Sequence, residues 1–246
     1  MTPKVEIRNL AFGYDGRRVL EDLSFQVEPQ SFVSILGTSG CGKSTILNLL
    51  SGVLKPEAGE MLVDGQPLSG ISSHFAYMPQ NDLLFDWKTI LDNVCLYGKI
   101  HGTLAKAKEE ALASFEAFGL AGCENMYPGS LSGGMRQRAA FLRKALCKAD
   151  VLLLDEPFGA LDVISRGDMQ DWLFSMRARL SKTALLVTHD VDEAIYLSDK
   201  ILVLGGRPAH VVRTFEVKEK NRSRDWLFAQ GALRSDIYKC IKGETP

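Results

Sequence analysis

The chain has 246 residues, and its 29 Lys+Arg against 30 Asp+Glu leave a formal net charge of −1. Hydrophobic residues make up 46% and charged residues 24%, which is typical of a folded globular protein and not of a disordered one. The near-neutral charge balance argues against binding nucleic acid. No apolar run approaches the ~18 residues of a membrane-spanning helix, and no apolar signal core follows Met1. We therefore expect a cytosolic protein.

The first part of the chain, about residues 1–85, has the patterns of β-strands around one helix. Apolar residues alternate with polar ones at Val5–Ile7 and at Leu23–Val27, and Asp64-Gly65 is a hairpin turn signal. Strands are predicted around Val5–Ile7, Leu23–Val27, Ser31–Leu36, Met61–Asp64 and His74–Met78, with a helix at Ser44–Leu50.

The middle of the chain changes to a helical period. Thr89–Ile100 and Leu104–Phe118 both have it, and in the second stretch the apolar face includes Leu112. A further helix is predicted from Arg136 to Cys147. We therefore interpret about residues 86–149 as a helical subdomain inserted into the sheet-based core.

Three continuous apolar runs then mark strands that are covered on both faces, as in a parallel sheet. They are Val151–Asp155, Ala184–Val187 and Ile201–Leu204, and a short strand after Pro208 and a final helix over Asp225–Ile241 follow. The fold class predicted is α/β, with a mostly parallel sheet, an N-terminal antiparallel β subdomain and the inserted helical subdomain.

The cysteines indicate neither zinc nor disulfides. There are five, scattered and without a CxxC pair, and the four histidines are widely spaced. Cys95, Cys123 and Cys147 lie in apolar stretches, where we expect them to pack as small hydrophobes.

A glycine-rich loop follows the strand Ser31–Leu36 and opens the helix Ser44–Leu50. It fits G-x-x-x-x-G-K-S with Gly37, Thr38, Ser39, Gly40, Cys41, Gly42, Lys43 and Ser44. Its backbone N–H groups and the helix start favour an anion, Lys43 can bridge terminal phosphates, and the Ser44 hydroxyl can hold Mg²⁺. A chance glycine-rich turn is the alternative, but the strand and helix on its two sides favour a phosphate-binding loop.

Two carboxylates end the strand Val151–Asp155. Ligands of parallel sheets lie beyond the carboxyl ends of the strands, so Asp155 should face the same phosphates and Glu156 should reach an attacking water. Alone, such an acidic pair is usually a solvated strand end.

Ser132-Gly133-Gly134 precedes the helix Arg136–Cys147 and is a candidate for a second, lysine-free anion site. By itself it would more often be a plain helix cap. Two readings stay open: both anion sites bind one nucleotide within the chain, or each completes a site in a second copy.

Together these residues resemble the ATPase subunit of ATP-binding cassette (ABC) transporters, with the family's motifs in order from about Val5 to Val212. Gly37–Thr45 resembles the Walker A loop, with a P-loop NTPase core, and Ser132-Gly133-Gly134 resembles the signature sequence. Asp155 and Glu156 match Walker B and the catalytic glutamate. The remaining matches are Tyr14 (adenine stacking), Gln80 (Q-loop), Asp162 (D-loop) and His189 (switch histidine).

Each of these remaining matches also has an ordinary structural alternative. Tyr14 could cover a turn, Gln80 could be a surface loop residue, and His189 could be a satisfied structural histidine. Their places relative to the phosphate loop favour the family roles.

The resemblance implies an ATPase that uses ATP and Mg²⁺. Glu156, His189 and Lys43 would be catalytic, Tyr14, Gly37–Thr45 and Gln80 would bind nucleotide, and Ser44, Gln80 and Asp155 would hold Mg²⁺. The partners implied are a second copy in a head-to-tail dimer, a transmembrane permease and, indirectly, a solute-binding protein. The subunit would lie at the cytoplasmic face of the membrane.

Finer features are similar to the nitrate, sulfonate and taurine importer group. These are the sequence LSGGM, the segment Pro157–Asp162 and the segment Leu83–Trp87 followed by Asp92-Asn93-Val94. The loop Gly70–His74 and Met78-Pro79-Gln80 depart from that group. We therefore favour the interpretation that the chain is an importer ATPase. The alternative is a non-transport ABC-type ATPase, for example in iron–sulfur assembly.

One domain, 1–246, is expected. Residues 1–85 and 150–215 would form the nucleotide-binding core, residues 86–149 the helical subdomain with the signature, and residues 216–246 a C-terminal helical extension. Phe85 and Trp87 could either face the permease or pack inside the insert, and the sequence does not decide between the two.

Overall fold

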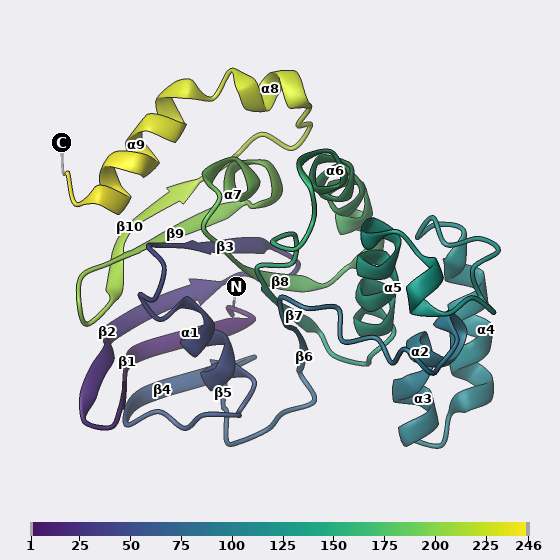
Figure 1. The fold of residues 1–246 in the computed structure, drawn as a ribbon. Helices are drawn as coiled ribbons and strands as arrows, with labels where there is room; N and C mark the ends of the chain where they lie inside the picture. Colours follow the sequence, from purple (N-terminus) through teal and green to yellow (C-terminus); the bar gives the residue numbers. More distant parts are fainter. Residues whose placement is uncertain (1, 245–246) are drawn as a thin grey trace.

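Two β-sheets organise the computed structural model, which describes residues 2–244 (Figure 1). The first has the strand order β2-β1-β4-β5 and is antiparallel throughout. The second has the order β10-β9-β3-β8-β7-β6 and is parallel except where β10 pairs antiparallel with β9. The strands are β1 (Val5–Tyr14), β2 (Arg17–Val27), β3 (Phe32–Leu36), β4 (Ala58–Val63), β5 (Gln66–Pro67), β6 (Phe75–Met78), β7 (Val151–Asp155), β8 (Thr183–Thr188), β9 (Lys200–Gly205) and β10 (His210–Glu216).

The antiparallel sheet follows from the alternating pattern at the start of the chain. Val5 pairs with Val27 and Ile7 with Phe25, and all four side chains are buried. Asp64 and Gly65 both have positive φ, 52° and 76°, as a tight hairpin turn between β4 and β5 requires. The predicted turn is therefore confirmed.

The parallel sheet is buried on both faces, which explains its continuous apolar strands. Every residue of β3, β7 and β8 is buried. Neighbouring residues of one strand face different cores: Leu153 packs with α1 and the antiparallel sheet, whereas Leu152 and Leu154 pack on the side of the other helices. The predicted α/β fold class is confirmed.

The helices cover the parallel sheet and build a separate helical part (Figure 1). Helix α1 lies between the two sheets, whereas α2, α3 and α4 lie beyond the edge strand β6. No helix within residues 2–244 is long and apolar enough to cross a membrane. The helices are α1 (Lys43–Leu50), α2 (Ile90–Val94), α3 (Leu96–Ile100), α4 (Leu104–Phe115), α5 (Gly133–Ala145), α6 (Val163–Leu180), α7 (Val191–Leu197), α8 (Arg224–Phe228) and α9 (Gly231–Lys242), with a 3₁₀ turn at Pro128–Ser130.

Two predicted helices are each divided into two shorter helices. The pattern over Thr89–Ile100 divides at Cys95, which ends α2 and precedes α3. The predicted final helix divides into α8 and α9, because Gln230 leaves helical geometry and its side-chain amide donates to the Trp226 carbonyl at the end of α8. Cys95 and Cys123 are buried as expected, whereas Cys147 is only partly buried.

Helix α4 ends at Phe115 and not at Phe118, and it leaves Leu112 exposed on the face that was predicted to pack. Helix α6 was not predicted at all. Its sequence begins with the exposed pair Val163 and Ile164 and includes Gly167, so its apolar periodicity is weak.

Candidate nucleotide-binding site

The loop between β3 and α1 is shaped by glycines. Gly40 and Gly42 have φ of 75° and 104°, in the left-handed region that favours glycine. A Cβ on Gly42 would lie 2.9 Å from Val19 Cγ1 and 3.0 Å from Leu20 Cδ2. The sequence of the loop therefore fits its tight turn against β2.

Lys43 is folded into this loop. Its ammonium donates to the carbonyl oxygens of Gly37 at 2.9 Å and Thr38 at 3.1 Å, and the residue is only 6% exposed. The positive charge is thereby held beside the first N–H groups of α1. Such a cradle of N–H groups and one cation can bind a phosphate anion.

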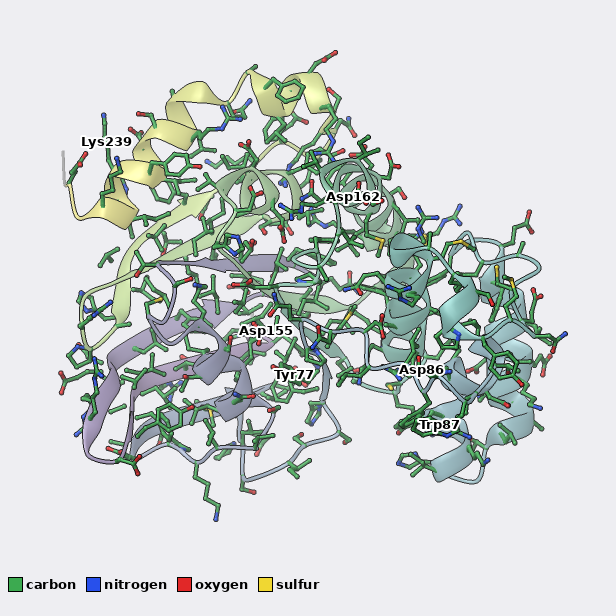
Figure 2. The ribbon with its side chains drawn as sticks, in the orientation of Figure 1. Tyr77, Asp86, Trp87, Asp155, Asp162 and Lys239 are labelled. Carbon is green, nitrogen blue, oxygen red and sulfur yellow. The ribbon has the colours of Figure 1, made fainter. Side chains whose placement is uncertain are left out.

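Asp155, at the end of β7, connects two other elements of the site. Its Oδ1 accepts a hydrogen bond from Ser44 Oγ at 3.0 Å, and its Oδ2 accepts one from Tyr77 OH at 2.9 Å. Figure 2 shows Tyr77 and Asp155 next to one another in the centre of the molecule. Burial, and then the Asp155 charge, raise the pKa of Tyr77 above its ordinary value, so the phenol stays a donor. Ser44 and Asp155 thus present the hard oxygen ligands that suit Mg²⁺.

Glu156 and His189 form a pair at the same edge of the sheet. Glu156 has a φ of 45°, which is uncommon for a residue with a side chain. Its N–H donates to the Val187 carbonyl at 2.9 Å, and its Oε1 lies 3.3 Å from His189 Nδ1. The backbone of β8 therefore fixes Glu156 in the geometry from which it meets His189.

The phosphate loop and Glu156 line a cavity of about 530 Å³, whereas Tyr77, Asp155 and His189 are not among its lining residues. Tyr14 stands at its rim, 45% exposed, with its ring 4.8 Å from that of Phe12 in an edge-to-face contact. The lining residues are Tyr14, Arg17, Arg18, Val19, Ser39, Gly40, Cys41, Gly42, Lys43, Ser44, Thr45, Glu156, Gly206, Arg207, Pro208 and Ala209. The cavity thus joins a phosphate cradle, a carboxylate and an exposed aromatic ring.

Gln80 lies near this site but is not bonded to its oxygen ligands. It is exposed, and a Cβ on Gly159, in the loop after Glu156, would lie 3.0 Å from its Nε2. No hydrogen bond within residues 2–244 joins Gln80 to Ser44 or Asp155. Within residues 2–244 the predicted magnesium ligand therefore has no hydrogen bond to the other two proposed ligands.

Ser132-Gly133-Gly134 does not line the cavity. Ser132 begins α5, and its Oγ accepts a hydrogen bond from the Met135 N–H at 3.3 Å. A Cβ on Gly133 would lie 3.3 Å from the Leu161 side chain, so this motif adjoins the loop before α6.

Asp162 begins α6 and accepts hydrogen bonds from the N–H groups of Ile164 at 3.1 Å and Ser165 at 3.0 Å. Hydrogen bonding, first from Ser165, lowers the pKa of this carboxyl. Like the Ser132 motif, Asp162 lies outside the cavity lining. Of the two readings left open by the sequence, these positions favour the one that needs a second copy.

The sequence did not single out Tyr77, Arg17, Arg18 or Arg207. Tyr77 has an apolar neighbour on either side in β6, and only the pairing of β6 with β7 brings its hydroxyl to Asp155. The arginines come from two hairpins far apart in the sequence. No local motif marks such residues.

A glycine-rich phosphate loop between a parallel strand and a helix, with an acidic pair at the end of a nearby parallel strand, defines a P-loop nucleotide triphosphatase. The ABC transporter family model matches residues 20–159. The chain therefore belongs to the ABC transporter family, and it is an ATP-binding cassette with the ATPase site of that family. The predicted family is confirmed.

The similar proteins and structures are also ATP-binding subunits or cassettes of ABC transporters. The chain is 45% identical over 236 residues to the formylaminopyrimidine import ATP-binding protein ThiZ of Halalkalibacterium halodurans, covering 95% of this chain and 92% of the relative. It is 37% identical over 228 residues to the taurine import ATP-binding protein TauB of Yersinia pestis, covering 91% and 88%. The dimeric structure of the bacterial ABC transporter cassette MJ0796 is similar with a TM-score of 0.73 at 26% identity, covering 87% of this chain and 99% of the other.

Proposed function

We propose that this chain is the ATP-hydrolysing subunit of an ABC importer and powers uptake of a small solute through a separate membrane permease. The observation that carries the proposal is a cavity lined by both Lys43 and Glu156, the carboxylate that pairs with His189. The relatives named as import ATP-binding proteins support the direction of transport. They also favour an importer over iron–sulfur assembly.

ATP would bind along the cavity with its base at Tyr14 and its phosphates in the loop Gly37–Thr45. The exposed Tyr14 ring offers a face for stacking, and such contacts are worth about 1–3 kcal/mol per base. Lys43 would exchange its two backbone carbonyl partners for terminal phosphate oxygens. The triphosphate is then surrounded by donors that the fold has already positioned.

Mg²⁺ fits the oxygen pair Ser44 and Asp155, with Gln80 as the third proposed ligand. When bound, the ion would neutralise charge that develops on the phosphates. Asp155 already accepts two hydrogen bonds that orient both of its oxygens, so its carboxylate is fixed for this task.

Glu156 would accept the proton of the attacking water. A positioned general base typically accelerates the reaction by about 10²–10⁴-fold. His189, 3.3 Å away, would orient Glu156 and donate to the terminal phosphate. The strained backbone at Glu156 supports this role, since such conformations concentrate at functional sites.

A second copy would complete the site in a head-to-tail dimer. Ser132-Gly133-Gly134 and Asp162 lie outside the cavity of their own chain and begin two helices that pack on one another. From a partner, the N–H groups of this signature segment would face the terminal phosphate. The dimeric structure of the related cassette supports such pairing. ATP would then favour the closed dimer, and hydrolysis would release it.

The permease would dock on the helical part around Trp87, which is 73% exposed (Figure 2). Its ring lies 5.1 Å from that of the half-buried Phe85. The buried Asn93 fixes this loop. Its side-chain oxygen accepts a hydrogen bond from the Phe85 N–H, and its side-chain nitrogen donates to the carbonyl oxygens of Phe85, Lys88 and Thr89. We therefore assign Trp87 to the docking surface and Phe85 to its support.

In this assignment the chain is peripheral at the cytoplasmic face of the membrane, and a solute-binding protein delivers the solute to the permease. Residues 1–85 and 150–215 form the nucleotide-binding core, 86–149 the helical subdomain, and 216–246 the C-terminal extension.

The Glu156→Gln variant tests the function. We expect ATP to trap it as a dimer on a sizing column, with turnover nearly abolished. Glu116→Gln, an exposed change on the helical part, is the matched control and should stay active. Unchanged turnover in Glu156→Gln would overturn the role of this carboxylate.

Trp87→Ala separates transport from the alternative function. It should keep the ATPase activity of the isolated chain but lose stimulation by the permease and co-purification with a polytopic membrane protein. If the wild-type chain co-purifies with soluble iron–sulfur assembly proteins instead, the importer assignment fails.

A further inference from the structure

Three arginines line the nucleotide cavity, Arg17, Arg18 and Arg207, and within residues 2–244 only Arg18 has an ion pair. Arg18 forms an ion pair with Glu57 at 2.8 Å. Arg207, from the turn between β9 and β10, is exposed, and its side chain has no hydrogen bond or ion pair with any residue in the described range 2–244. A guanidinium that lines a cavity without a protein partner is free to bind an anionic ligand there.

The backbone around Arg207 is fixed. Gly206 has a φ of 83°, and a Cβ on it would lie 2.9 Å from the Pro208 carbonyl oxygen. Ala209 N–H donates to the Val19 carbonyl at 2.8 Å, and Glu21 N–H donates to the Ala209 carbonyl at 3.2 Å. These bonds attach the turn to β2, the strand that also packs on Gly42 of the phosphate loop. The base of the Arg207 side chain is therefore held beside the cavity.

The charge of Arg207 reaches the middle of the phosphate loop. Burial raises the pKa of the Cys41 thiol, while the positive charges of Lys43 and Arg207 act in the opposite direction. Cys41 lies between the two glycines of positive φ in the loop. Lys43 and Arg207 thus act on the same residue of the loop from two different elements.

We propose that Arg207, from the turn between β9 and β10, binds the phosphates of the nucleotide and is an additional determinant of nucleotide affinity. The assignment rests on the proposed binding of ATP in this cavity. An arginine can contact a phosphate through two parallel N–H groups, a geometry that lysine lacks. The turn at Gly206, between β9 and β10, brings Arg207 into the lining of the cavity.

The test is the affinity of Arg207→Ala for MgATP, MgADP and adenosine by titration calorimetry. Loss of one charge-assisted contact should weaken both nucleotides about 5- to 20-fold. Adenosine, which lacks phosphates, should bind within about twofold of the wild type by the same reasoning. Arg207→Lys keeps the charge without the fork and should fall between Arg207→Ala and the wild type.

Arg213→Ala is the matched control, because Arg213 lies on the same hairpin, is exposed and does not line the cavity. Unchanged nucleotide affinity in Arg207→Ala would overturn the proposal, and so would an equal loss for adenosine. A thermal unfolding midpoint equal to that of the wild type without nucleotide establishes that the variant folds. Failure of the importer assignment would leave these affinities unchanged, whereas failure of ATP binding would appear in the wild type itself.

Discussion

The hydrogen bond between Tyr77 and Asp155 gives a sharp test of the site's architecture. Tyr77→Phe removes only the hydroxyl, which donates to Asp155 Oδ2 at 2.9 Å. Asp155 is 8% exposed and then retains the Ser44 hydroxyl as its remaining side-chain donor. A hydrogen bond to a charged, largely buried acceptor is worth about 1–3 kcal/mol, and we expect the free energy of unfolding to fall by about 1–2 kcal/mol.

For a chain of this length each kcal/mol shifts the midpoint by about 2–4 °C, so Tyr77→Phe should melt about 2–8 °C below the wild type. Differential scanning calorimetry measures this shift. Tyr238→Phe is the control, because Tyr238 is 49% exposed and should give no shift. An unchanged midpoint in Tyr77→Phe would refute the role of this hydroxyl.

The same bond predicts a pH dependence. The pKa of Tyr77 is raised in the folded chain, so its contribution is fully present below the ordinary tyrosine pKa of about 10. Above that pH the unfolded chain loses the proton more readily, and the contribution falls as pH rises. The stability difference between wild type and Tyr77→Phe should therefore be constant below about pH 10 and shrink above it. A difference that grows there would contradict this reasoning.

Three further changes have expected outcomes. Arg222→Ala removes a buried guanidinium that donates to four backbone carbonyl oxygens, so urea titration should show a loss of about 3 kcal/mol in the free energy of unfolding. The control Arg179→Ala, at an exposed residue, should leave the free energy of unfolding nearly unchanged. Gly42→Ala places a Cβ against β2 at a φ of 104°, so scanning calorimetry should show a loss of about 1–3 kcal/mol in the free energy of unfolding. Titration calorimetry should detect no ATP binding, and wild-type affinity for ATP would contradict this expectation. Asp162→Ala loses a helix cap, whereas Asp162→Asn keeps its acceptor oxygen without the charge. Because hydrogen bonding lowers the Asp162 pKa, the stability difference between wild type and Asp162→Ala should shrink as pH falls through that pKa, toward the difference between Asp162→Asn and Asp162→Ala. A stability difference that does not shrink in acid would contradict the contribution of the charge.

The sequence predicts the sheets better than the helices. Strands such as Val151–Asp155 are short, continuous and apolar because both faces are buried, and a sequence pattern records that directly. Helix α6 has only four buried residues in 18, so it carries little periodicity and was missed. Breaks such as the one at Gln230 depend on a side chain that caps the preceding helix, which a periodic pattern does not reveal.

The site divides in the same way. The phosphate loop is one continuous segment of the sequence, and so is the acidic pair. The glycines of the first and the carboxylates of the second can therefore be recognised from the sequence alone. Tyr77 and Arg207 reach the site only through the pairing of β6 with β7 and through the docking of the β9–β10 turn on β2. Such contacts depend on register and turn geometry, which no local motif encodes.

Activity in mixtures of two inactive variants tests most directly whether one chain completes the site of another. Lys43→Ala removes the phosphate cation, and Gly134→Asp places a negative charge in the signature segment at a position where a Cβ meets nothing within 4 Å of its own chain. Each variant alone should be inactive. In a mixed dimer one site keeps both an intact Lys43 and an intact Gly134, so an equal mixture should recover about a quarter of wild-type ATPase activity. A mixture as inactive as its components would show that the two segments act within one chain.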